Sequence, residues 1–119
     1  MAATIKELQK AKESLAQALT QPYSDIVRDA SIQRFEFCIE LTWKVLKKKM
    51  GSASVAPKMI IREAAQQGLL DEPTLWIQFL DARNLTSHTY NESTAKEVFE
   101  KVKEFLPELE ALFTKLEKI

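Results

Sequence analysis

Apolar residues recur along much of this chain at spacings of three and four, the period of one face of an α-helix. The first such stripe consists of Leu8, Ala11, Leu15 and Ala18. The sequence Thr4-Ile5-Lys6-Glu7 precedes it and is a capping box, in which a Thr hydroxyl and a Glu carboxylate satisfy free backbone donors. Because Gln21-Pro22-Tyr23 follows, we expect a first helix that begins after Thr4 and ends before Gln21.

The second segment, from about Asp25 to Met50, is apolar around most of its circumference, which is typical of a central and buried helix. We expect Trp43 to be a core residue, and Cys38 to be a small buried side chain rather than a nucleophile. The polar exceptions fall four residues apart and form one charged ridge: Glu36, Glu40, Lys44 and Lys48. Gly51 follows as the expected stop.

Three further helices complete the pattern. Pro57 suits the first turn of a third helix that Gly68 closes, and a fourth helix starts at Pro73 after Asp71 or Glu72. A break near Tyr90-Asn91 precedes the last helix, which has the most regular stripe: Ala95, Val98, Phe99, Val102, Phe105, Leu106, Leu109, Leu112, Phe113 and Leu116. Amphipathic helices joined by short connections predict an all-α fold, an up-and-down antiparallel bundle of four or five helices.

The length and composition limit what this bundle can be. The chain has 119 residues, of which 45% are hydrophobic and 29% charged, so we expect one folded domain over residues 1–119. Lysine plus arginine equals aspartate plus glutamate at 17 each. This zero net charge argues against a protein that coats nucleic acid or lies on an anionic membrane.

The composition also bears on location and on metal binding. Cys38 is the single cysteine, which excludes an intrachain disulfide and favours a cytoplasmic protein. The first 13 residues lack the apolar region of a signal peptide, and no segment has the apolar length of a membrane span. One histidine and one cysteine in different segments do not make a zinc site, so we expect no metal and no cofactor.

The residues that carry candidate chemistry cluster at the end of the fourth helix, between Asp81 and Tyr90. On an ideal helix Asp81, Asn84 and His88 would share one polar stripe. Arg83 instead continues the apolar stripe of Trp76, Phe79 and Leu80, where a guanidinium needs a charged partner or a site at a cleft. Glu36 and Glu40 of the second helix are candidate partners. The same residues also fit a structural role, since a helix C-terminus favours a histidine and an arginine can extend from the core edge to water.

The spacing Arg83-Asn84-x-x-x-His88-x-Tyr90 resembles the Arg-x4-His-x-Tyr motif of HEPN domains. Four further blocks resemble one HEPN branch, the nucleotidyltransferase substrate-binding proteins: Arg34-Phe35-Glu36-Phe37, Glu40-Leu41-Thr42-Trp43-Lys44, Ile61-Arg62-Glu63-Ala64 with Gly68-Leu69, and Leu75-Trp76. The resemblance runs from about residue 30 to residue 106. It implies a helical bundle that dimerises and works with a small nucleotidyltransferase encoded beside it.

The resemblance also implies roles for the motif residues. In related pairs the HEPN chain is a metal-independent ribonuclease toxin, and the nucleotidyltransferase silences it by adding AMP to the motif tyrosine, here Tyr90. His88 would then act as acid or base, Arg83 would bind phosphate, and Asn84 would orient the histidine or the substrate. One chain supplies one histidine, so we expect a homodimer through the motif helix to complete the site. The alternatives are a non-catalytic subunit that binds a substrate or nucleotide, and a purely structural dimeric module.

Overall fold

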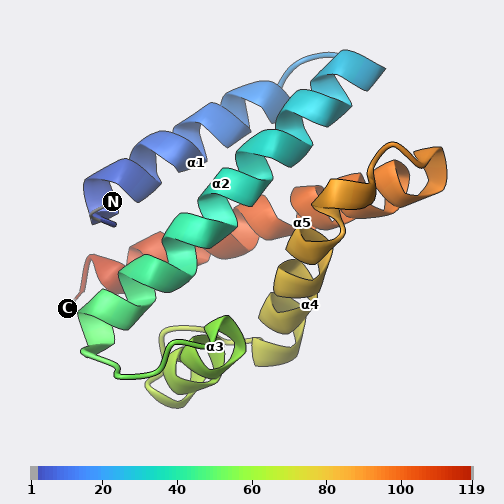
Figure 1. Cartoon of the computed structure of the whole chain (residues 1–119). Coiled ribbons are helices and arrows are strands. Elements are labelled where there is room, and N and C mark those ends of the chain that lie inside the picture. Colours follow the sequence, from blue (N-terminus) through green and yellow to red (C-terminus); the bar gives the residue numbers. More distant parts are fainter. Residues whose placement is uncertain (1–2, 119) are drawn as a thin grey trace.

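The computed structural model describes residues 3–118, and every regular element in that range is a helix (Figure 1). The elements are α1 (Ile5–Leu19), α2 (Asp25–Met50), α3 (Pro57–Gln66), α4 (Pro73–Asn84), the short 3₁₀ helix η1 (Thr86–His88) and α5 (Glu92–Leu116). Long α1 and α2 lie side by side, and α5 crosses behind them, while α3 and α4 are shorter (Figure 1). The predicted all-α helical bundle is confirmed.

The helix ends follow the local sequence. The Thr4 hydroxyl accepts a hydrogen bond from the Glu7 amide at 3.1 Å, and the Asn91 side chain accepts one from the Thr94 amide at 3.2 Å. Gly51 ends α2 in the left-handed region at φ 61°, which a residue without a Cβ adopts at little cost. The predicted capping residues therefore set the bounds of α1, α2 and α5.

Helix α2 is the centre of the bundle, because it contacts every other helix. Its Phe35 is fully buried and meets Phe105 of α5 edge to face, with ring centroids 5.1 Å apart. Trp76 and Phe79 of α4 pack on the same Phe105 ring at 5.6 and 5.3 Å. This aromatic cluster joins α2, α4 and α5 and confirms the prediction of a central, buried second helix.

Two aromatic residues of α2 are less buried than the pattern suggests. Phe37 is 55% exposed, and Trp43 is only partly buried, with its indole N–H donating to Glu40 at 3.3 Å. The prediction that Trp43 is a core residue therefore holds only in part. Phe37 shares a helical face with Gln33 and Lys44, and this is the face of α2 that other helices leave open to solvent.

Cys38 lies on another face of α2, one that packs into the bundle, and is fully buried, as predicted. Burial raises the pKa of its thiol to about 12, because the low-dielectric core disfavours a thiolate. A thiol that stays protonated and shielded is a packing residue and not a nucleophile.

The end of α4 differs from the sequence prediction. An unbroken helix was expected to reach the break at Tyr90-Asn91, but α4 stops at Asn84 and the 3₁₀ helix η1 follows. The Thr86 hydroxyl donates its one proton to the Glu36 carboxylate of α2 and lies 2.7 Å from the Arg83 carbonyl oxygen. A hydroxyl this close to the backbone of the last α4 turn can compete for its proton partners and disfavour further helix, and the tie to Glu36 holds the chain in the tighter turn.

No helix within residues 3–118 combines the length and the apolarity needed to cross a membrane.

Candidate functional site

Arg83 extends from the last turn of α4 to α2 and forms an ion pair there. Its Nε lies 2.6 Å from Oε1 of Glu40, and the two side chains are 36% and 33% exposed. Of the two candidate partners, Glu36 and Glu40, the structure pairs Arg83 with Glu40. Ion pairs this open to solvent contribute about 0–1 kcal/mol to stability, so a bound anion could compete with Glu40 for the guanidinium.

A pocket of about 290 Å³ lies beside this ion pair. It combines carboxylates, cations and apolar side chains, and α4 supplies only Arg83, while the remaining lining residues come from α2: Gln33, Glu36, Phe37, Glu40, Leu41 and Lys44. Three of the four ridge residues predicted on α2, Glu36, Glu40 and Lys44, thus line the pocket with Arg83. Most of the ridge is part of the candidate site.

Glu36 links the pocket to the turn that follows α4. Its carboxylate accepts the hydrogen bond from Thr86, the first residue of η1, 50 residues further along the chain. The tie fixes η1 against α2, and η1 ends at His88. From the sequence, Glu36 was expected only as a candidate partner for Arg83. In the structure Glu36 positions the segment that carries His88.

His88 and Tyr90 are both open to solvent at the end of this turn. The His88 amide donates to the Leu85 carbonyl at 2.9 Å, and the residue is exposed. The rings of His88 and Tyr90 lie edge to face with centroids 6.0 Å apart, and Tyr90 is 86% exposed. A macromolecule could reach both rings without any rearrangement of the bundle.

The motif residues are only partly brought together within one chain. Among the described residues, no hydrogen bond, ion pair or ring contact joins Arg83 to His88, and the Asn84 side chain is exposed. Asp81 faces α3, where it pairs with Lys58 at 3.2 Å. The polar stripe of Asp81, Asn84 and His88 does not form, because α4 ends before His88.

Arg28 is buried, with 5% of its surface exposed, and was not predicted from the sequence to have a role. Its guanidinium lies 3.1 Å from Asp29, 2.7 Å from Glu92 and 3.6 Å from Asp25. Burial lowers the pKa of Arg28, but the hydrogen bonds to Asp29 and Glu92 more than offset this and raise it above its ordinary value. The signal was present in the acidic neighbours one turn before Arg28 and one residue after it. Because Glu92 begins α5, this ion pair anchors the chain directly after Tyr90.

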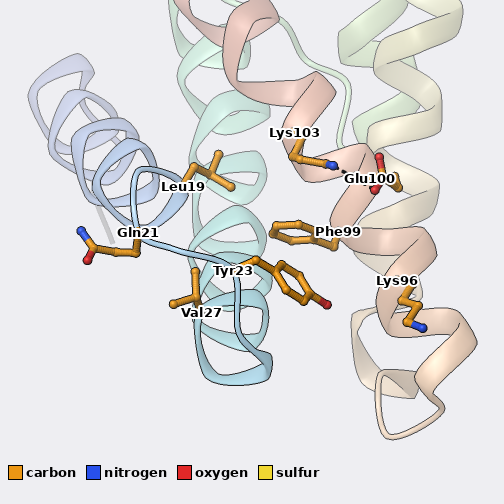
Figure 2. Close-up of a pocket in the computed structure, with 8 residues that line it drawn as sticks. All are labelled: Leu19, Gln21, Tyr23, Val27, Lys96, Phe99, Glu100 and Lys103. Atoms are coloured by element: carbon orange, nitrogen blue, oxygen red, sulfur yellow. Dashed lines mark ion pairs between the residues drawn. The ribbon is translucent and has the colours of Figure 1, made fainter.

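A groove larger than the Arg83 pocket lies elsewhere and was also not predicted from the sequence. It has a volume of about 690 Å³ and runs between the α1–α2 connection and α5 (Figure 2). Its central contact joins Tyr23 to Phe99, with ring centroids 5.5 Å apart. Within residues 3–118, no three His, Cys, Asp or Glu side chains gather as a metal-binding group.

The chain is similar to known proteins over most of its length. A family model described as "nucleotidyltransferase substrate binding protein like" matches residues 3–118. The "probable ribonuclease HepT" of Haemophilus influenzae is 33% identical over 100 residues, which cover 77% of this chain and 68% of that protein.

Two solved structures have the same fold. A protein from Thermus thermophilus superposes with a TM-score of 0.83 and 36% identity, over 92% of this chain and 98% of that one. A Haemophilus influenzae protein superposes with a TM-score of 0.84 and 30% identity, over 96% and 99%. Its structure is described as revealing "the fold of a substrate binding domain of a nucleotidyltransferase". With the match of residues 3–118, these likenesses confirm the resemblance seen in the sequence blocks, and the chain belongs to the nucleotidyltransferase substrate-binding protein family.

Proposed function

We propose that this chain is the HEPN subunit of a two-protein module with a small nucleotidyltransferase, and that it cleaves RNA in the cytoplasm without a metal ion. The observation that carries the proposal is the placement of Arg83 at a pocket whose neighbouring turn presents His88 to solvent. The similarity to a protein named as a probable ribonuclease supports it.

The motif residues suit cleavage through the ribose 2′-hydroxyl. In this reaction the 2′ oxygen attacks the adjacent phosphorus, a 2′-O–P bond forms and the bond from phosphorus to the 5′ oxygen breaks. A base removes the 2′-hydroxyl proton and an acid protonates the departing 5′ oxygen. His88 can serve either role, because an imidazole ring has one nitrogen that can accept a proton and one that can donate a proton. The Arg83 guanidinium offers a planar set of donors to the phosphate oxygens as their charge grows.

One chain contributes one histidine, so the proposed site is completed by a second copy. The solvent-facing side of α2 carries two apolar side chains on one helical face, Ile26 at 82% exposure and Phe37 at 55%. Phe37 also lines the Arg83 pocket. A two-fold dimer that buries this face together with the end of α4 would place two Arg83 and two His88 side chains along one groove.

Tyr90 is proposed as the site at which the nucleotidyltransferase silences the chain. Its hydroxyl would attack the α-phosphorus of ATP, forming a Tyr–O–P bond and releasing pyrophosphate, while the tyrosine proton passes to a base of the partner enzyme. The 86% exposure of Tyr90 would let the partner's active site reach it. The added AMP would lie beside His88, where its phosphate would repel an RNA backbone and its adenine would block access by its size.

The test measures cleavage of a labelled RNA and growth arrest on expression, for the wild type, Arg83→Ala, His88→Ala and the exposed control Lys10→Ala. Loss of both activities in the two motif variants, with unchanged circular dichroism and an active control, is the expected result. Cleavage by His88→Ala at the wild-type rate would refute the ribonuclease assignment. Incubation with the nucleotidyltransferase and ATP should add one AMP mass that maps to Tyr90 and is absent from Tyr90→Phe.

A second function is favoured by the description of the family and of the Haemophilus influenzae structure, namely a non-catalytic subunit that binds substrate for a nucleotidyltransferase. The separation of Arg83 from His88 within one chain fits this reading as well. The two functions differ in two results: a binding subunit would support the transferase reaction with His88→Ala as well as with the wild type, and it would cut no RNA by itself. A purely structural dimeric module would do neither.

A further inference from the structure

We propose that the groove between the α1–α2 connection and α5 binds a nucleotide of single-stranded RNA outside the cleavage site. This inference rests on the proposed function, because it gives the ribonuclease a second contact with its substrate. The groove lies on a different set of residues from the Arg83 pocket, and the two share no lining residue.

The centre of the groove is aromatic and accessible. Tyr23 is 59% exposed although it lies against the ring of Phe99, whose other neighbour is the Lys103 ammonium at 5.3 Å from the ring centroid. An exposed tyrosine ring held in place by a second ring is a stacking surface for a nucleobase. Leu19 of α1 and Val27 of α2 contribute apolar side chains to the lining of the groove.

The rim of the groove is suited to a phosphate backbone. Figure 2 shows Lys96 on one side of the two rings and the Lys103–Glu100 pair, at 2.9 Å, on another. Glu100 neutralises Lys103, whereas Lys96 is exposed and has no ion-pair or hydrogen-bond partner within residues 3–118. Lys96 and Lys103 are seven residues apart on α5, about 10 Å along the helix, so they flank the rings along the groove.

Single-stranded RNA fits this chemistry better than a free nucleotide does. Sites for small ligands use convergent polar groups to fix the orientation of the ligand. This groove offers two rings, one free lysine and one amide, Gln21, spread over about 690 Å³. Stacking with loosely placed cations is the sequence-tolerant recognition used for single strands.

The position of the groove also favours the RNA substrate. Along the chain, Lys96 lies one helical turn after Glu92, and Val27 precedes Arg28, so the Arg28–Glu92 ion pair joins residues next to the groove with the start of α5, just after the turn that carries His88 and Tyr90. A strand cut at His88 would pass this ion pair to place a flanking base on Tyr23. The groove therefore extends the proposed substrate path around one end of the bundle.

The experiment measures binding of a fluorescein-labelled 12-nucleotide 2′-O-methyl oligouridine, which cannot be cleaved through a 2′-hydroxyl, by fluorescence anisotropy. We expect Tyr23→Ala to raise the Kd at least about fivefold, as loss of one base stack does, and Tyr23→Phe to bind within twofold of the wild type. Lys96→Glu should weaken binding and reduce the slope of log Kd against log salt by about one. The matched charge control is Lys10→Glu, at an exposed position of α1, and it should weaken oligonucleotide binding clearly less than Lys96→Glu does.

Binding by Tyr23→Ala within twofold of the wild type, or an equal loss in Lys10→Glu and Lys96→Glu, would overturn the groove as an RNA site. The same holds if AMP or ATP binds at the groove and the oligonucleotide does not. Cleavage that depends on His88 is measured separately, so the RNA-binding role of the groove can be refuted while the ribonuclease proposal is supported. Absence of cleavage together with Tyr23-dependent binding would instead support the groove as an RNA-binding site and refute the ribonuclease activity.

Discussion

Replacement of Thr86 by valine tests whether one hydroxyl holds the motif turn against α2. Thr86 donates to the Glu36 carboxylate and lies 2.7 Å from the Arg83 carbonyl oxygen, and valine has the same shape without the hydroxyl. A hydrogen bond to a charged group contributes about 1.5–3 kcal/mol, and half-burial of both partners reduces this to about 1–2 kcal/mol. At about 4 °C per kcal/mol for a chain of this size, we expect Tm to fall by roughly 4–8 °C.

The effect should be concentrated in the turn. Thermal unfolding followed by circular dichroism gives the Tm, and hydrogen exchange should show faster exchange of the His88 and Asn91 amides with little change in α1. Thr86→Ser keeps the hydroxyl and should retain most of the stability. A Thr86→Val protein that melts within 1 °C of the wild type, with unchanged exchange in the turn, would refute the role given to Glu36.

Three further predictions concern the bundle itself. Phe105→Ala should lower the free energy of unfolding by about 3–5 kcal/mol in urea titration, because it removes a fully buried ring that touches three other aromatic residues, and a loss below 1 kcal/mol would contradict this packing. Gly51→Ala should cost about 1 kcal/mol in the same assay, because φ is 61° there although a Cβ would meet no atom within 4 Å; a neutral result would mean that the turn relaxes. The Cys38 thiol keeps its proton up to about pH 12 when folded but loses it near pH 8.5 when unfolded, so the folded state binds more protons and stability should fall as pH rises between these values. The alkaline loss should be smaller in Cys38→Ala, and identical pH profiles for the two proteins would contradict the raised pKa.

The parts of the fold that local spacing controls were predictable from the sequence. Thr4, Gly51, Pro57 and Asn91 act on backbone groups within a few residues, so they indicated helix ends directly. The pairing of Arg83 with a carboxylate of the second helix was also predictable, because an arginine on an apolar helix face needs a carboxylate and the ridge of the central helix offered two, Glu36 and Glu40.

The remaining features depend on contacts between distant segments. The end of α4 at Asn84 follows from Thr86 bonding to Glu36, a residue 50 positions earlier, and no local pattern contains that contact. The exposure of Phe37 depends on which side of α2 the other helices leave uncovered. The Tyr23–Phe99 groove requires the α1–α2 connection to meet α5, which the periodicity of each helix alone does not determine.

The Arg28–Glu92 ion pair has a consequence for the order of folding. It joins residues 64 positions apart, whereas α1 and α2 meet through a short connection. Closing the longer loop costs more chain entropy, so the hairpin of α1 and α2 should form before α5 docks. The turn that carries His88 and Tyr90 is fixed at one end by Glu36 and at the other by Arg28, and it becomes ordered only at that last step. A chain still emerging from the ribosome would therefore hold all the motif residues and yet have no assembled site.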